Sequence, residues 1–125
     1  MKMEECYALF GGNYADVKSR LMKDELIKKF VIKFLSDPSY EQLEEAINQQ
    51  NHKNAFLAVH TLKGLSKNFS FDRLSSATEQ LTETLRNWES APVDETLCEE
   101  QWKRVSAEYL VVTDVIKKYV ETEVE

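Results

Sequence analysis

The feature that most constrains this chain is an apolar pattern of helical spacing that continues almost from end to end. It is clearest near the C-terminus, where apolar residues recur in alternating steps of three and four: Trp102, Val105, Tyr109, Val112, Ile116 and Tyr119. Residues with this spacing lie on one face of an α-helix, so the segment predicts a long amphipathic helix. One helix cannot bury its own apolar stripe, and the chain is therefore expected to fold as several packed helices.

Three other long segments repeat this pattern and are separated by clear stop signals. Asp37-Pro38 ends the first of them, because proline has no amide proton for a helical hydrogen bond. The connection Ser70-Phe71 is so short that the helices on either side of it should form an antiparallel hairpin. We therefore predict an all-α fold, an antiparallel four-helix bundle whose long members cover residues 23–36, 52–69, 72–88 and 95–121.

Shorter helices are expected beside these four. Two precede the bundle, over about residues 4–10 and 13–20, and a third covers about residues 39–50. Aromatic residues near the N-terminus are expected to close one end of the bundle: Tyr7, Phe10 and Tyr14. Because 125 residues is the size of one domain, residues 1–125 are interpreted as a single domain.

Composition argues against several classes of function. Sixteen basic and 22 acidic residues give a formal net charge of -6, so neither nucleic acid nor an acidic membrane surface is expected as a partner. Only 3 glycines are present, too few for a glycine-rich phosphate-binding loop, and a nucleotide-binding enzyme is not expected. Cys6 and Cys98 match no metal-binding spacing and are interpreted as the reduced thiols of a cytoplasmic protein.

The segment 52–69 departs from an ordinary amphipathic helix around His60. On a helical wheel of about 100° per residue, the apolar residues gather roughly opposite His60, which therefore faces outward. The residues within about 60° of His60 form an unusual solvent face: Lys53, Phe56, Leu57, Lys63, Gly64 and Lys67. Glycine weakens a helix by about 1 kcal/mol relative to alanine, so Gly64, one turn beyond His60, is interpreted as clearing space beside the imidazole.

The residues around His60 combine a nucleophile with nearby positive charge. A neutral imidazole with an accessible nitrogen is a nucleophile, which makes His60 the candidate catalytic residue. Lys63 and Lys67 would stabilise the roughly 1.5 to 2 negative charges that a phosphoryl group brings. Phe56 and Leu57 add apolar area at the edge, the composition expected where a partner protein docks.

The sequence His-Thr-Leu-Lys-Gly at residues 60–64 resembles the H-x-x-K-G motif of histidine-containing phosphotransfer (HPt) domains. The resemblance extends over the hairpin formed by residues 58–74, and the helix order and chain length also fit this family. It implies a bundle whose exposed histidine receives a phosphoryl group from a receiver domain or histidine kinase and passes it to another receiver. The chain departs from the family at Ser70, where many members have glycine at the hairpin turn.

The resemblance implies a role for each matching residue. His60 would be the phospho-acceptor, Lys63 the electrostatic partner of the phosphate and Gly64 the residue that gives access, with Lys67 and Arg86 as secondary candidates. The implied partners are a response-regulator receiver domain, a hybrid histidine kinase, or both, and the receiver would supply Mg²⁺. The protein itself would need no cofactor, would have neither an ATP site nor independent turnover, and would act as a monomer.

A second function remains open, a non-catalytic helical adaptor of HPt shape that binds a receiver or another helical partner. Exposed Phe56 and Leu57 would be sufficient for that role. An enzyme of another kind is not expected, because no second catalytic group can be placed near His60. No metal site is predicted either, since His52 lies two helical turns from His60.

Overall fold

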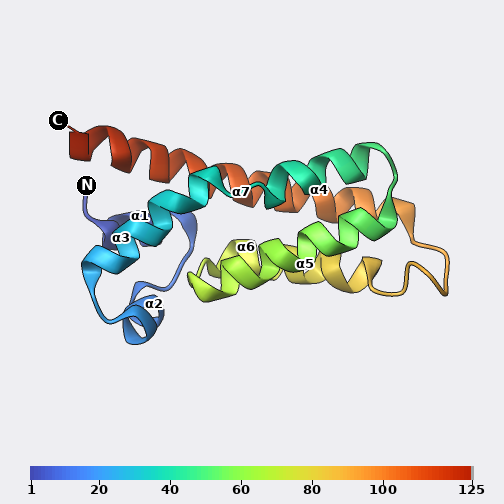
Figure 1. Cartoon of the computed structure of the whole chain (residues 1–125), viewed down its shortest axis with the longest axis horizontal. Helices are drawn as coiled ribbons and strands as arrows, with labels where there is room; N and C mark the ends of the chain where they lie inside the picture. Colours follow the sequence, from blue (N-terminus) through green and yellow to red (C-terminus); the bar gives the residue numbers. More distant parts are fainter. Residues whose placement is uncertain (125) are drawn as a thin grey trace.

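The computed structural model describes residues 1–124, which form α-helices and one short 3-10 turn (Figure 1). In chain order these elements are α1 (Met3–Phe10), α2 (Tyr14–Leu21), α3 (Asp24–Lys33), η1 (Phe34–Ser36), α4 (Ser39–Asn48), α5 (His52–Asn68), α6 (Asp72–Leu85) and α7 (Glu95–Val124). The predicted all-α class is confirmed. Within residues 1–124, no helix combines the length and the apolar character needed to cross a bilayer.

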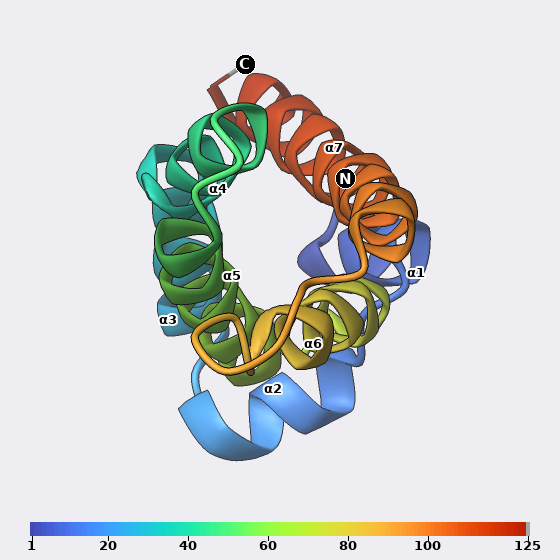
Figure 2. The ribbon, with the colours of Figure 1, turned by 90° about the vertical axis from the view of Figure 1, so that its right-hand side faces the viewer.

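The bundle consists of α4, α5, α6 and α7, which surround a common core when viewed along the long axis (Figure 2). Successive helices pack side by side, α4 along α5, α5 along α6 and α6 along α7. Tyr40 of α4 stacks on Tyr109 of α7 with 3.8 Å between ring centroids, which closes the bundle. The helix over residues 72–88 ends earlier than expected, at Leu85, and Trp88 is half-buried in the following turn.

The bundle member beside α5 differs from the one expected. Residues 23–36 form α3 and η1, whereas the helix that packs along α5 is α4, in the segment expected to be a minor helix. The physical reason is the Asp37-Pro38 break. Asp37 has an extended backbone, so the segment formed by α3 and η1 ends there and a separate helix, α4, follows. The helix restarts at Ser39, whose backbone N–H donates to Asp37 Oδ1 at 2.9 Å.

An aromatic cluster fills one end of the molecule and joins α1 to the hairpin between α5 and α6. Phe71, in the hairpin turn, lies with its ring centroid 5.0 Å from that of Phe10 and 5.2 Å from that of Phe34. Tyr7 packs 4.8 Å from Phe10, and half-buried Tyr14 packs edge-on against Tyr7. The expected closure of this end by N-terminal aromatic residues is therefore present.

The N-terminal helices also fix the C-terminal end of α5. Arg20 Nη2 donates to the backbone oxygens of Lys67 at 3.1 Å and Asn68 at 2.6 Å, and Tyr7 Oη donates to that of Phe69 at 2.7 Å. Carbonyls in the last turn of a helix have no partner within the helix, and here side chains from α1 and α2 supply one. The helix that carries the candidate site is therefore held at its end by tertiary hydrogen bonds.

Candidate functional site

The orientation of α5 presents His60 to solvent. The helix begins after Asn51, whose side chain accepts a hydrogen bond from the Asn54 backbone N–H at 3.0 Å. One face of α5 is buried in the bundle and consists of Ala55, Ala58, Val59, Leu62 and Ser66. His60 lies on the opposite face and is exposed, as its position on the helical wheel predicted.

Open space lies beside His60 at Gly64. A Cβ atom built on Gly64 would have no other heavy atom within 4 Å outside the local helix. The fold itself therefore does not need a glycine at this position. Lys63 is half-buried and Lys67 is exposed. These two lysines of α5 lie one residue before and three residues after Gly64 in the sequence.

An aromatic ring from the preceding turn of α5 covers one side of His60. The Phe56 and His60 rings stack with 5.9 Å between centroids and 19° between planes. The guanidinium carbon of Arg86, which follows α6, lies 5.8 Å from the centroid of the Phe56 ring. Phe56 is half-buried and therefore connects the candidate nucleophile with the end of α6.

Two acidic residues of α6 form ion pairs with basic residues of the candidate site. Arg86 donates to the Glu83 carboxylate through Nη2 at 2.7 Å and through Nε at 3.1 to 3.2 Å. The hydrogen bond from Arg86 is the main cause that lowers the pKa of Glu83, and the charge of Lys63 also lowers it. Lys67 Nζ lies 3.5 Å from Glu79 Oε1. Lys67 and Arg86 are thus each paired with a carboxylate of α6.

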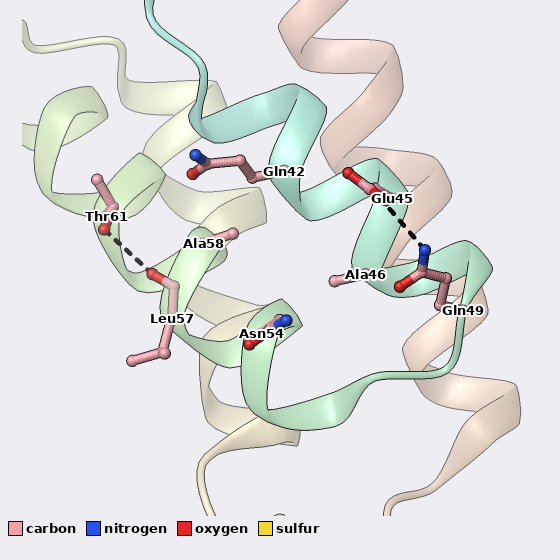
Figure 3. A pocket seen from close by; sticks show the side chains of 8 residues that line it. All are labelled: Gln42, Glu45, Ala46, Gln49, Asn54, Leu57, Ala58 and Thr61. Carbon is pink, nitrogen blue, oxygen red and sulfur yellow. Dashed lines mark hydrogen bonds between the residues drawn. The ribbon is translucent and has the colours of Figure 1, made fainter.

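A groove of about 400 Å³ lies between α4 and α5 (Figure 3). Its lining combines small apolar residues with amide, hydroxyl and carboxylate groups: Gln42, Glu45, Ala46, Gln49, Asn54, Leu57, Ala58 and Thr61. Leu57 is 53% exposed, and its backbone oxygen accepts a hydrogen bond from Thr61 Oγ1 at 3.1 Å. The groove therefore offers both an apolar contact and polar groups.

The structure separates the predicted site residues onto the two flanks of His60. Phe56 and Arg86 lie toward α6, and Leu57 lies toward the groove beside α4. Glu79 and Glu83 could not be assigned from the motif, although Glu83 and Arg86 have the i, i+3 spacing of a helical ion pair. The groove could not be assigned either, since it depends on α4 lying beside α5.

Comparisons with known proteins point to one family. A family model described as Hpt domain matches residues 36–120, which is more than half of the chain. The comparisons with curated proteins and with solved structures gave no match. The matched segment includes α4, α5, α6 and most of α7, and it therefore contains the whole surroundings of His60.

Proposed function

The chain belongs to the Hpt domain family, and from this premise we propose that it is a phosphorelay intermediate that carries a phosphoryl group on His60. Histidine phosphotransfer in phosphorelays is the general activity of such domains. The observation that carries the assignment to His60 is its exposure together with the open space at Gly64. The other histidine, His52, is 29% exposed and lies 2.6 Å from Glu95 Oε1, so it is a poor candidate.

The proposed step is an in-line displacement at phosphorus. The lone pair of one His60 ring nitrogen attacks the aspartyl phosphate of a docked receiver domain. The N–P bond forms while the P–O bond to the aspartate breaks, and the carboxylate leaves with the bonding electrons. The proton on the other ring nitrogen takes no part. The reverse step returns the phosphoryl group to the aspartate of a second receiver, so the protein turns over no substrate of its own.

The receiver and this protein would stabilise the phosphoryl group at different stages of the transfer. The receiver supplies Mg²⁺ and most of the stabilisation of the transferring group. Lys63 stabilises the phosphoryl group once it is attached to His60, because the group adds negative charge beside an ammonium ion. Gly64 and Leu57 let the receiver approach, Gly64 through open space and Leu57 through an apolar contact at the groove.

Phosphoryl transfer from a labelled receiver tests the proposal. The wild-type protein, His60→Gln and His52→Gln are incubated with a phosphorylated receiver, and acid-labile phosphate on each is measured. Label is expected on the wild type and on His52→Gln, and none on His60→Gln, because His60 is exposed whereas His52 is paired with Glu95. Circular dichroism of both variants checks that they are folded. Equal labelling of the wild type and His60→Gln overturns the proposal.

The adaptor function gives a different pattern in the same variants. A non-catalytic adaptor would keep its partner affinity in His60→Gln and carry no phosphate in any variant. Gly64→Gln would still weaken docking in that case, because its side chain would enter the open space at Gly64. Signalling that depends on both residues favours phosphotransfer, whereas signalling that depends on Gly64 alone favours the adaptor.

A further inference from the structure

We infer that Glu83, Arg86 and Phe56 are positioning residues that hold the His60 ring in the orientation needed for attack on phosphorus. This inference rests on the proposed function, since it concerns the same imidazole. It assigns a role to Glu83, and it changes the expected role of Phe56 and Arg86 from partner docking to support of the nucleophile.

The first observation is that His60 has no polar support of its own. Among residues 1–124, no hydrogen bond or ion pair joins either ring nitrogen of His60 to another group. An exposed side chain on a helix interconverts among rotamers within nanoseconds when nothing restrains it. Attack on phosphorus needs one ring nitrogen aligned with the scissile P–O bond, so a contact other than a hydrogen bond that limits the ring would favour the reaction.

The second observation is the stack between Phe56 and His60. The centroid separation of 5.9 Å and the 19° interplanar angle describe an offset stack of two nearly parallel rings. Such a contact restricts rotation of the imidazole and leaves both ring nitrogens free, one to attack and one to keep its proton. A hydrogen-bonding neighbour would instead occupy one of those nitrogens.

The third observation is that Phe56 is itself supported from α6. Arg86 lies with its guanidinium carbon 5.8 Å from the Phe56 centroid, within the range of a cation–π interaction. The Glu83 carboxylate accepts hydrogen bonds from Nε and Nη2 of that guanidinium, which limits the orientations of the planar group. Glu83, Arg86, Phe56 and His60 therefore form a continuous series of contacts that joins α6 to the nucleophile.

The variants Phe56→Leu and Phe56→Tyr test the aromatic step of this series. Leucine keeps apolar bulk without a ring, and tyrosine keeps the ring. Two readouts are measured: the chemical shifts of the His60 ring protons, which sense the ring current of Phe56, and the dependence of the phosphotransfer rate on receiver concentration. Phe56→Leu is expected to lose the ring-current shift and about tenfold in maximal rate, with the half-saturating receiver concentration changed by less than about twofold. Phe56→Tyr is expected to restore both readouts.

The variants Glu83→Gln and Glu79→Gln test the support from α6. They are a matched pair, because both remove one exposed carboxylate of α6 that faces a basic side chain. Glu83→Gln is expected to weaken the ring-current shift on His60 and to lower the maximal rate by about threefold, because Arg86 loses its anchor. Glu79→Gln is expected to leave the ring-current shift on His60 unchanged, since its partner Lys67 does not contact Phe56.

Three outcomes would overturn the inference. In the first, Phe56→Leu keeps the wild-type ring-proton shifts and maximal rate. In the second, its whole effect lies in the half-saturating receiver concentration, which would make Phe56 a docking residue. In the third, Glu83→Gln raises the rate, which would mean that Glu83 merely restrains a phosphate-binding Arg86. Failure of the proposed function is distinguishable from all three, because the wild type would then take up no phosphate or no more than His60→Gln.

Discussion

Gly64 is a residue that the fold does not need to be glycine but that the proposed function does. It lies in the middle of α5, where glycine costs a helix about 0.5–1 kcal/mol relative to alanine. Since an added Cβ would meet no other group, Gly64→Ala is expected to raise the free energy of unfolding by that amount. The same variant is expected to lower phosphotransfer, and Gly64→Gln to lower it further, because the side chain grows toward the docked receiver. Urea denaturation and transfer rates measure the two effects.

Gly12 provides the control for this prediction, because its surroundings are the opposite. A Cβ on Gly12 would lie 2.6 Å from Tyr7 Cδ2 and 2.8 Å from the Ser70 backbone oxygen. Gly12→Ala is therefore expected to destabilise the protein by about 1–3 kcal/mol and to leave the transfer rate per folded molecule unchanged. Wild-type transfer rates in both Gly64 variants would contradict the proposed role of Gly64 in access.

At the scale of single elements, Ser70 lies in the turn of the hairpin between α5 and α6. The resemblance to HPt domains leads one to expect glycine there, and Ser70 indeed has the positive φ of 56° that glycine tolerates best. Its side chain compensates through two hydrogen bonds to α2: Ser70 Oγ donates to Asp16 Oδ2 at 2.6 Å and accepts from Arg20 Nη2 at 2.6 Å. The turn is thus joined to the N-terminal helices by polar contacts that glycine could not make.

Two substitutions at Ser70 separate the backbone strain from the hydrogen bonds. Both Ser70→Gly and Ser70→Ala remove the hydrogen bonds, and only alanine keeps a Cβ at positive φ. Ser70→Ala is expected to be less stable than Ser70→Gly by about 1 kcal/mol, and less stable than the wild type by about 1–2 kcal/mol. Chemical denaturation gives these differences. Equal stability of the two variants would mean that the turn relaxes to another conformation.

The elements of this protein were predictable where local chemistry decides them. The Asn51 cap, the buried face of α5 and the exposure of His60 all follow from spacing along one helix. The choice of α4 over residues 23–36 as the bundle member beside α5 did not follow, because both segments carry an apolar stripe and only tertiary packing selects between them. The contact of Arg86 with Phe56 was missed for the same reason, as it joins two helices.

At the scale of the whole molecule, two buried thiols report whether its two ends unfold together. Cys6 lies in α1 at the aromatic end and is 0% exposed, whereas Cys98 lies in the first turn of α7 and is 5% exposed. Burial raises the pKa of both thiols, that of Cys98 to about 11. The reactive thiolate is therefore scarce near pH 8 in the native protein, and a thiol reagent should react with either cysteine only when it becomes exposed.

Because of the aromatic cluster, we expect that the Cys6 thiol becomes exposed only when the whole molecule opens. Tyr7 and Phe10, which follow Cys6 in α1, pack against Phe71, so α1 cannot detach without breaking the core at the α5–α6 hairpin. The single-thiol variants Cys98→Ala and Cys6→Ala are expected to react with an aromatic disulfide reagent at rates within about threefold of each other, once corrected for their stabilities from urea denaturation. Both rates are expected to rise steeply with urea. A much faster reaction of Cys6 would show instead that α1 opens alone, leaving the C-terminal end of α5 without the Tyr7 hydrogen bond.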